Sequence, residues 1–536
     1  MTFPTPSYNS ARAYLMTIST PTTLGPFVNE PIADYRRPEN VRCMRQAIAE
    51  VRAQLGREYQ LIIGGEPIRT ADKIISVNPA NPSEIVGIHQ KAGLEHVEPA
   101  MQAALAAYEK WQYASVAQRT GVLLRTAQIL RRRKFEFNAW LVLEVGKNYP
   151  EAEADTAEAI DFLELYARQA LVLDRAEPVV QLPGERDFLR YIALGVGAVI
   201  SPWNFPNAIA LGMTGASLVC GNTVVLKPSS DSPTIAAKFF EALVEAGMPA
   251  GVVNFCPGSG ATFGNGLVAH PKTRYIAFTG SRDVGLDIHS RAAEPQKGQI
   301  WIKRTVLEMG GKDTIVVDAD ADLDAAVEGV AASAFGFQGQ KCSACSRAVV
   351  HQDIYDEFLK KLQATVETLA IGLPEDNAQL GPVISQGAMQ SILNYIEIGK
   401  REGRLITGGA RAPGDGYFIQ PTVIADLDPA ARLSLEEIFG PVLAIVKAKS
   451  FDHALEIANN TEYGLTGSVY TASEDKIERA KREFHVGNLY INRKCTGAVV
   501  GAHPFGGFNM SGTESKAGGT DFMYLFSQSK SIGQKL

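Results

Sequence analysis

Residues 222–258 read NTVVLKPSSDSPTIAAKFFEALVEAGMPAGVVNFCPG, and this stretch decides the fold class. Short apolar runs that contain paired valines stand near its two ends, and between them apolar residues recur at helical spacing. A strand, a helix and a second strand in this order are typical of parallel βαβ units. Sheets built from such units bind their ligands at the carboxyl ends of the strands.

The same alternation continues on both sides of this stretch. Further short apolar runs lie at 196–202 (VGAVISP), 275–280 (YIAFTG) and 304–311 (RTVLEMGG). A second alternating series spans 313–492. Upstream of both series, long helices are predicted at 40–55, 111–147 and 149–173. We therefore expect an α/β protein.

The composition is that of an ordinary globular protein. Of the 536 residues 46% are hydrophobic and 21% are charged, and the length favours two or three domains. A net charge of −6 and the lack of a basic stripe argue against a nucleic-acid partner. Residues 191–226 carry no charge, but Pro202 and Pro206 interrupt them, so we predict no membrane span there.

The number of cysteines and the composition of the N-terminus indicate the cellular compartment in which the protein is expected. Six cysteines in so long a chain are too few for a disulfide scaffold, which favours a reducing compartment. Residues 1–29 contain no acid and a single base, Arg12, whereas a mitochondrial transit peptide needs several arginines. We interpret them as a floppy leader and expect a cytoplasmic protein rather than one of the mitochondrial matrix.

Two segments have the pattern of isolated strands. Residues 178–194 predict a β-hairpin with its turn at Pro183-Gly184. The tail at 521–532, DFMYLFSQSKSI, predicts a lone strand, which must pair with a sheet edge. The edge of another subunit is a reasonable partner, so we expect a homodimer or a larger homo-oligomer.

The stretch GQKCSACSR (339–347) holds two cysteines three positions apart. A single C-x-x-C pair with no second pair argues against a metal site. A thioredoxin-like redox pair would lie after the first strand of a small domain, whereas this pair lies deep in a long chain. A buried structural thiol is the third alternative, because it is a common role for cysteine. Gly336 and Gly339 let a ligand approach closely, and the following Ser and Ala residues suit a helix start. A nucleophilic Cys342, with thiolate character from the helix dipole, fits these features best.

Two polar residues are candidates for catalytic roles beside a nucleophile. Glu308 ends an apolar strand pattern and precedes two glycines, so it is either a solvated charge or a general base near a cleft. Asn204 lies between Pro202 and Pro206, where it is either a turn residue or a rigid donor to an oxyanion.

Cofactor contacts are expected after two of the strands. Lys227 follows a predicted strand, where the ribose or phosphate of a cofactor would lie. Gly280 and Ser281 open a predicted helix whose N-terminus suits a phosphate. No regular G-x-G-x-x-G motif is present, so these glycines alone are weak evidence.

Together these motifs resemble the aldehyde dehydrogenase superfamily over about residues 60–530. FGFQGQKCSACSR is similar to the cysteine signature of that family, and LEMGGK, with its Glu 34 residues upstream, to the glutamate signature. PWNFP, KPS, FTGS and EEIFGP appear in the family order. The resemblance implies an α/β fold made of a helical region with a Rossmann-type NAD-binding domain (1–176 and 196–308), a catalytic domain (309–505) and a small β oligomerisation arm (177–195 and 506–536).

The resemblance also implies chemical roles. Cys342 would be the nucleophile, Asn204 with the backbone NH of Cys342 would form the oxyanion hole, and Glu308 would activate the deacylating water. Cys345 would pack one helical turn further on, and no metal is implied. The residues expected to contact NAD are Lys227, Ser230, Gly280, Ser281, Gly285, Glu437 and Phe439. Many NAD-preferring members carry Glu where this chain has Ser230, so NADP use is plausible as well.

Other stretches resemble one group within the superfamily, the 1-pyrroline-5-carboxylate dehydrogenases. They are NEP (29–31), YQLIIGGE (59–66) and CTGAVVGAHPFGGFNMSGTESKAGG (495–519). The resemblance implies oxidation of L-glutamate γ-semialdehyde to L-glutamate in proline breakdown, through a cysteine thiohemiacetal and a thioester. The NH groups of Gly497 and Ala498 and the hydroxyl of Ser343 would bind the α-carboxylate, and Phe205 and Phe505 would enclose the aliphatic chain.

Two alternatives stay open at this point. One is another semialdehyde dehydrogenase, for example one for succinic semialdehyde, whose carboxylate anchor would normally be cationic. The other is a non-catalytic binding member of the fold, which would be expected to lack the nucleophile or the base. For the favoured interpretation, proline dehydrogenase would supply the substrate, so functional coupling to that enzyme is expected.

Overall fold

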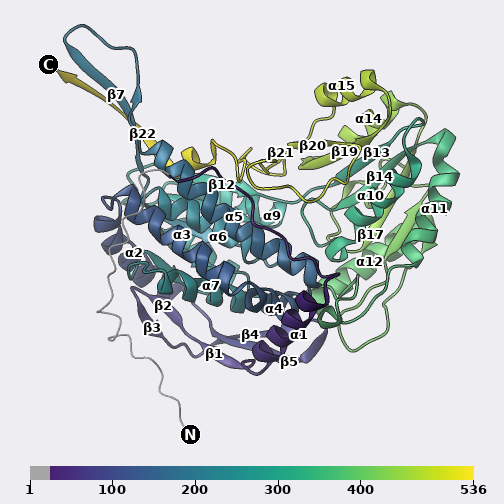
Figure 1. The fold of residues 1–536 in the computed structure, drawn as a ribbon, viewed down its shortest axis with the longest axis horizontal. Helices are drawn as coiled ribbons and strands as arrows, with labels where there is room; N and C mark the ends of the chain where they lie inside the picture. The colour runs from purple at the N-terminus through teal and green to yellow at the C-terminus, as the bar shows by residue number, and fades with distance from the viewer. Residues whose placement is uncertain (1–23) are drawn as a thin grey trace.

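The computed structural model describes residues 24–536 and contains two seven-stranded sheets, each at the centre of an α/β half (Figure 1). The first sheet has the order β12 (Arg304–Glu308), β11 (Tyr275–Thr279), β8 (Val196–Ile200), β9 (Thr223–Lys227), β10 (Val253–Phe255), β2 (Leu61–Ile63) and β3 (Glu66–Ile68). The first five strands are parallel, and β2 and β3 are added antiparallel. The unit predicted at 222–258 is confirmed as β9, α7 (Pro233–Glu245) and β10.

The second sheet has the order β15 (Arg404–Thr407), β16 (Thr422–Ala425), β17 (Val442–Ala448), β14 (Cys345–His351), β13 (Asp313–Val317), β19 (Thr466–Tyr470) and β20 (Asn488–Ile491). All of its pairings are parallel except that of β15 with β16. Along β13, Ile315 and Val317 pack into one apolar cluster and Val316 into another. Both faces of this sheet are therefore buried, which explains why its strands are continuous apolar runs in the sequence.

Two of the predicted long helices are confirmed, and the single helix predicted at 111–147 is wrong. Residues 40–55 lie mostly in α1 (Pro38–Arg52), and residues 149–173 form α5 (Tyr149–Leu173). The stretch 111–147 is divided into α3 (Val116–Arg132) and α4 (Lys134–Val145), because Arg133 leaves helical geometry at φ −104° and ψ 21°. The other helices of this half are α2 (Val97–Trp111), α6 (Ala208–Val219), α8 (Asn265–Ala269) and α9 (Arg282–Ala293).

The second half is covered by its own helices. They are α10 (Leu323–Phe335), α11 (Tyr355–Glu367), α12 (Gln386–Glu402), α13 (Arg432–Leu435), α14 (Phe451–Asn459) and α15 (Glu474–Glu483). A small sheet of β1 (Arg57–Tyr59), β5 (Asn81–Gln90) and β4 (Lys73–Asn78) lies near α1, and a two-stranded sheet joins β18 (Tyr463–Gly464) to β21 (Phe508–Asn509). No helix within residues 24–536 is long and apolar enough to cross a membrane.

The strand that follows the cysteine pair corrects the expected local structure. Residues 345–351 form β14, which pairs with β13 and β17, and not the helix that the Ser and Ala residues suggested. Cys345 is therefore the first residue of a central strand, and the prediction that it packs one helical turn beyond Cys342 is wrong. The valines at 349 and 350 favour a strand, and burial on both faces of the sheet decides the outcome.

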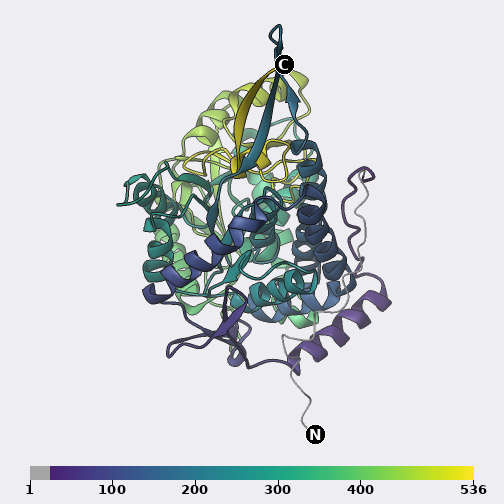
Figure 2. The same cartoon turned by 90° about the vertical axis from the view of Figure 1, so that its left-hand side faces the viewer.

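The predicted β arm projects from the first half (Figures 1 and 2). It pairs β6 (Glu177–Pro178) with β7 (Glu185–Ala193), and β7 with β22 (Ser527–Lys535). The C-terminal strand pairs along one edge with β7 of its own chain, and its pairing with the edge of another subunit stays a prediction. Its first residues also differ from the prediction, since Phe522–Phe526 form a 3-10 turn. One edge of β22 stays open, so the role of the arm in oligomerisation stays a prediction.

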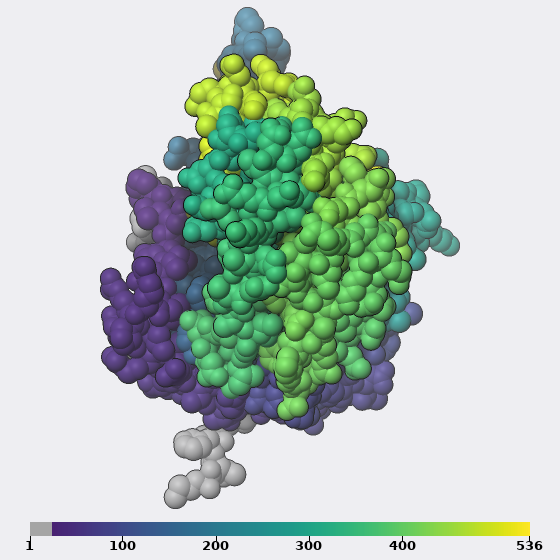
Figure 3. Space-filling view, turned by 90° about the vertical axis from the view of Figure 1, so that its right-hand side faces the viewer, coloured from purple at the N-terminus to yellow at the C-terminus, as the bar shows by residue number. Residues whose placement is uncertain are grey.

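The N-terminal strap, residues 24–37, runs along α5 before α1 begins (Figure 1). In the space-filling view the N-terminal residues flank the second half of the molecule (Figure 3). Asn29 donates to the carboxylate of Asp161 at 2.8 Å, and the NH of Glu30 donates to the same carboxylate at 2.6 Å. Most of the leader predicted at 1–29 lies outside the described residues, but its last six residues belong to this strap.

Candidate active site

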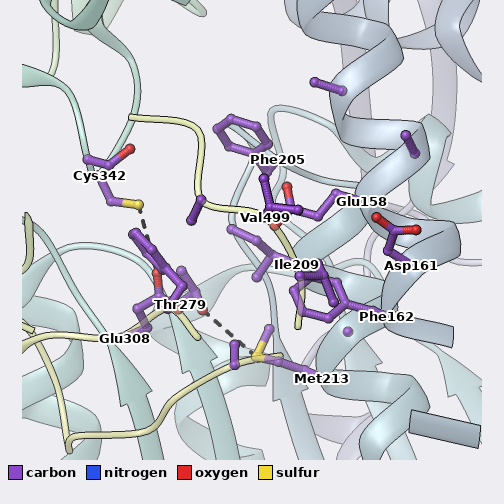
Figure 4. Close-up of a pocket in the computed structure, with 18 of the residues that line it drawn as sticks. Glu158, Asp161, Phe162, Phe205, Ile209, Met213, Thr279, Glu308, Cys342 and Val499 are labelled. Atoms are coloured by element: carbon purple, nitrogen blue, oxygen red, sulfur yellow. Dashed lines mark hydrogen bonds between the residues drawn. The ribbon is translucent and has the colours of Figure 1, made fainter. Parts of the chain in front are cut away.

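A cavity of about 340 Å³ collects most of the residues that the sequence nominated for catalysis and substrate binding (Figure 4). It is bordered by α5, α6, the ends of β11 and β12, and the loop around residue 498. Seven predicted residues line it: Cys342, Glu308, Ser343, Gly497, Ala498, Phe205 and Phe505. They come from positions as far apart as 205 and 505, so only the tertiary fold brings them together.

Cys342 and Glu308 face each other across this cavity. The Cys342 thiol donates to Oε1 of Glu308, with 3.8 Å between sulfur and oxygen (Figure 4). Burial, and then the charge of Glu308, raise the pKa of the Cys342 thiol well above its usual range. Burial also raises the pKa of Glu308 to about 7. The thiol therefore lies next to a base, and the expectation that Cys342 stands at a helix N-terminus is wrong, because a strand follows it.

The backbone before Cys342 is held in an unusual conformation. Phe337, Gln338 and Gly339 have consecutive φ values of 50°, 55° and 67°. Two non-glycine residues in this left-handed region are costly and persist only where surrounding contacts hold them. Gln338 donates through its side chain to the carbonyl of Pro382 at 2.8 Å, and the side-chain oxygen of Gln340 accepts from the NH of Ile384 at 2.9 Å. The nucleophile thus follows a fixed turn.

Asn204 lies beside this turn, in the loop between β8 and α6. It is buried, and its side-chain amide donates to the carbonyl of Gln340 at 3.2 Å, two residues before Cys342. In the described part of the chain the backbone NH of Cys342 makes no hydrogen bond. An amide NH2 close to an unused backbone NH could stabilise an oxyanion formed at Cys342.

A buried ion pair supports the aromatic wall of the cavity. Lys147 and Asp155 are both fully buried, with 3.1 Å between nitrogen and oxygen. The Lys147 ammonium lies 3.7 Å from the ring centre of Phe205 and 4.8 Å from that of Phe337. Asp155 also accepts from the NH of Ala208 at 2.7 Å, at the start of α6. This arrangement fixes the loop that carries Asn204 and Phe205.

The loop 497–501 forms a different wall, rich in backbone donors. Gly497 has a φ of +75°, a conformation that favours glycine. Within residues 24–536 the NH groups of Gly497 and Ala498 donate to no acceptor. The strap fixes this loop, because Asn29 donates to the carbonyl of Val500 at 3.0 Å. Adjacent free NH groups suit a carboxylate.

The predicted cofactor residues lie outside the cavity, mainly at the carboxyl ends of the first sheet. Lys227 ends β9, and among residues 24–536 its ammonium donates only to the carbonyls of Pro228 and Gly258, at 3.0 and 3.3 Å. Ser281 precedes α9 without capping it through its side chain, so the backbone donors of that helix start are open. Ser230 is exposed, and Gly285 is buried one turn into α9. These features fit the ribose and pyrophosphate of a dinucleotide.

Glu437 and Phe439 lie in the second half, facing the junction of the two sheets. The Glu437 carboxylate accepts from the NH of Gly311 at 3.0 Å, and burial raises its pKa to about 7. A Cβ atom on Gly310 would lie 2.1 Å from this carboxylate, so any larger residue there would displace the Glu437 side chain. Phe439 has a φ of 57° and meets the edge of Trp203 with 5.5 Å between ring centres. This pair belongs to the second half, whereas Lys227 ends a strand of the first sheet.

Several residues of the site were not predicted from the sequence. The cavity is also lined by Asn29, Glu151, Glu158, Asp161 and Lys341. The acids at 151, 155, 158 and 161 are spaced three or four residues apart within a predicted helix, which places them on one face. That spacing was a usable signal. Asn29 stands in the NEP stretch, but no role in the site was assigned to it, because its partners lie 132 and 471 residues away.

Comparison with known proteins agrees with the fold. The model of the aldehyde dehydrogenase family matches residues 68–532. A protein named 1-pyrroline-5-carboxylate dehydrogenase, from Geobacillus thermodenitrificans, is 57% identical over 510 residues, which cover 95% of this chain and 99% of that protein.

Two solved structures are similar over nearly the whole chain. A 1-pyrroline-5-carboxylate dehydrogenase from Thermus with bound NAD has a TM-score of 0.94 and 50% identity, and covers 96% of this chain and 100% of its own. Proline utilization A from Bdellovibrio bacteriovorus has a TM-score of 0.94 and 44% identity. The similar region spans 96% of this chain and 53% of proline utilization A, so this chain corresponds to about half of that protein.

Proposed function

This chain belongs to the aldehyde dehydrogenase family, and from that premise we propose that it oxidises L-glutamate γ-semialdehyde to L-glutamate with NAD. The semialdehyde is the open form of 1-pyrroline-5-carboxylate. One observation carries the proposal: a single cavity unites Cys342, Glu308 and the two free NH groups of the loop at Gly497 and Ala498. It offers a nucleophile with its base at one place and a carboxylate site at another.

The residues of the cavity suffice for the covalent steps. Glu308 accepts the proton of the Cys342 thiol, and the thiolate attacks the aldehyde carbon to form a thiohemiacetal. The side-chain amide of Asn204 and the backbone NH of Cys342 donate to the oxyanion, where one such donor typically contributes about 3 kcal/mol. When bound, the dinucleotide supplies the acceptor for the hydride that leaves this adduct. The product of that step is a thioester on Cys342.

After the proton taken from the thiol has passed to solvent, the Glu308 carboxylate acts again to release the product. It accepts a proton from water, and the resulting hydroxide adds to the thioester carbonyl. The carbon–sulfur bond then breaks, L-glutamate leaves, and Cys342 regains a proton. A pKa of about 7 suits this role, because the group exchanges protons readily near neutral pH.

The wall of the cavity opposes the succinic semialdehyde alternative. The free NH groups of Gly497 and Ala498, with the Ser343 hydroxyl beside the nucleophile, provide a neutral anchor for a carboxylate. The one lysine in the cavity lining, Lys341, is paired with Glu151 at 2.7 Å and so is not free to act as a cationic anchor. Phe205 and Phe505 offer apolar contacts to the chain between the two ends.

Assembly and location belong to the same proposal. We expect a homodimer or larger homo-oligomer built through the β arm, whose outer strand β22 has an open edge. Functional coupling to a proline dehydrogenase is supported by the similarity to one part of proline utilization A. All six cysteines are free thiols, which supports a cytoplasmic location.

The test is an NADH-formation assay on the purified protein with 1-pyrroline-5-carboxylate, repeated with NADP and with propanal. We expect kcat/KM for the semialdehyde to exceed that for propanal by about 100-fold or more, because an anchored charge and a filled pocket together contribute several kcal/mol. Equal values for the two aldehydes would show that the anchor loop has no role and would overturn the proposal.

A further inference from the structure

The backbone carbonyls of the nucleophile and of the next residue differ in their hydrogen bonds. The Ser343 carbonyl accepts from the Thr466 hydroxyl at 3.5 Å and from the Cys495 thiol at 3.4 Å. Within residues 24–536 the Cys342 carbonyl accepts no hydrogen bond. Most carbonyls in a protein interior have a donor, so the carbonyl of the nucleophile itself is an unused acceptor.

The carboxyl group of Asp313 has an unused oxygen as well. Asp313 is the first residue of β13, is 2% exposed, and pairs with Cys345 of β14. Its Oδ1 accepts from the NH of Thr466 at 2.7 Å, whereas its buried Oδ2 has no partner in the described part of the chain. A buried carboxyl oxygen is costly in this state unless it carries a proton and donates it.

These two unused oxygens are neighbours. A Cβ atom on Gly311 would lie 2.6 Å from Oδ2 of Asp313 and 2.8 Å from the carbonyl oxygen of Cys342, so both oxygens border the same small space. Two oxygens in such a position repel each other when both are only acceptors, and they attract when one of them carries a proton. The geometry therefore favours a proton on Asp313.

The charges around Asp313 favour the same state. Lys312 and Arg347 lie near it, but both donate to backbone carbonyls, and among residues 24–536 neither forms an ion pair with Asp313. Burial, and then the nearby Cys495 and Glu437, raise the pKa of Asp313 well above its usual range. A carboxyl group in these surroundings is neutral in the folded protein.

We propose that Asp313 is a neutral acid that donates a hydrogen bond to the carbonyl of Cys342 and thereby positions the nucleophile. This inference rests on the proposed function, in which Cys342 attacks the aldehyde. Asp313 does not line the cavity, so it acts through Cys342 and is a positioning residue. Enzymes use carboxyl groups that burial keeps neutral as hydrogen-bond donors in their active sites.

Fixing this carbonyl fixes the peptide plane between Cys342 and Ser343. The two residues joined by this plane both line the cavity, one with the nucleophilic sulfur and the other with the hydroxyl expected to bind the carboxylate. The turn at 337–339 holds the chain before Cys342, and Asp313 holds the chain after it. A misplacement of about 1 Å can cost about 100-fold in rate, so this hydrogen bond affects kcat.

The experiment uses three variants of the full-length protein. Asp313→Asn keeps the acceptor for Thr466 and replaces the acid proton by an amide donor, and Asp313→Leu has a similar shape without either group. The matched control is Asp318→Asn, just beyond the opposite end of β13, where a buried carboxylate is paired with Lys476. NADH formation gives kcat. Infrared difference spectra between the wild type and each Asp→Asn variant show whether the lost group was a carboxylic acid or a carboxylate.

Asp313→Asn should keep nearly the wild-type kcat, because a neutral donor replaces a neutral donor. Asp313→Leu should lower kcat by about 10- to 100-fold, and Asp318→Asn should leave it unchanged. At pH 7 the difference spectrum of Asp313→Asn should show the loss of a protonated carboxyl group, and that of Asp318→Asn the loss of a carboxylate. If Asp313→Asn is as slow as Asp313→Leu, the charge is what matters, and if Asp313→Leu is as fast as the wild type, the residue has no role. Either outcome overturns the inference.

The infrared measurement covers the case in which Asp313→Leu does not fold, because it needs only the wild type and Asp313→Asn. Loss of carboxylate bands in Asp313→Asn would overturn the inference by itself, since an ionised Asp313 has no proton to donate. An Asp313→Asn variant that does not fold would overturn it too, because the amide would then be no substitute for the acid. If the wild type does not oxidise the semialdehyde, the proposed function fails, and the infrared result still decides the state of Asp313.

Discussion

Glu308→Gln should turn the enzyme into a trap for its own intermediate. Glutamine has nearly the same shape but accepts no proton, so the step that activates water loses its base. Removal of a general base typically lowers the rate of its step by about 10²- to 10⁴-fold. Because Glu308 also accepts the proton of the Cys342 thiol, the variant should form the thioester more slowly than the wild type, but the thioester that forms should persist on Cys342 while the wild type hydrolyses it.

The pKa of Glu308 sets the pH dependence of the same step in the wild type. Burial raises this pKa to about 7, so the carboxylate form is about one eleventh of the enzyme at pH 6 and about ten elevenths at pH 8. Because the carboxylate is the active form, hydrolysis of the thioester should be about tenfold faster at pH 8 than at pH 6. Glu308→Gln should show no such rise.

The assay follows the acyl-enzyme directly, because release of the reduced cofactor can limit kcat and hide the pH dependence. Enzyme, cofactor and one equivalent of semialdehyde are mixed rapidly and quenched with acid at intervals. Intact-protein mass spectrometry then gives the acylated fraction. The reasoning is refuted if Glu308→Gln clears the thioester at the wild-type rate, or if the wild-type rate of clearance is the same at pH 6 and pH 8.

Three other substitutions test separate parts of the site. Cys342→Ala should abolish oxidation while Cys345→Ala keeps most of it, measured as NADH formation with folding checked by circular dichroism. Lys147→Met leaves a buried carboxylate without its cation and should lower the free energy of unfolding by about 3 to 5 kcal/mol, measured by urea denaturation. Asn29→Ala frees the loop 497–501 and should raise KM for the semialdehyde several-fold more than KM for propanal. Asn40→Ala, which removes a strap hydrogen bond remote from the cavity, should change neither KM.

Contrary results would be specific in each case. An inactive but folded Cys345→Ala would exchange the roles of the two thiols. A Lys147→Met variant as stable as the wild type would mean that its partner carboxylate is neutral in the folded protein. Equal increases in KM for both aldehydes in Asn29→Ala would show that the strap stabilises the fold without positioning the loop.

Much of the fold could be predicted because local patterns and tertiary needs agree. The stretch 222–258 has strand, helix and strand patterns that fold as β9, α7 and β10. The long helices at 149–173 and near 40–55 also follow from apolar spacing alone. The residues after Cys342 are the counterexample. Ser and Ala tolerate a helix, but the segment is buried between two strands and forms β14.

The candidate site divides in the same way. Cys342, Glu308 and Asn204 stand in short motifs whose residue types suit the chemistry, so the sequence alone nominated them. The state of the thiol could not be predicted, because its pKa depends on burial and on a carboxylate that the fold brings within 3.8 Å of the sulfur. The sequence supplied the helix-dipole argument, and the structure replaced it with an adjacent base.

By itself, the amino-acid sequence determined the alternation of strands and helices and the identity of the reactive groups, since both depend on residues that are near neighbours in the chain. Only the tertiary structure decided which charges are paired. Lys341 neutralises Glu151 from 190 residues away, Asn29 reaches Val500 across 471 residues, and Glu158 is left facing the cavity without a partner in residues 24–536. Electrostatic partners are set by distance in space and by burial, and neither is encoded in spacing along the chain.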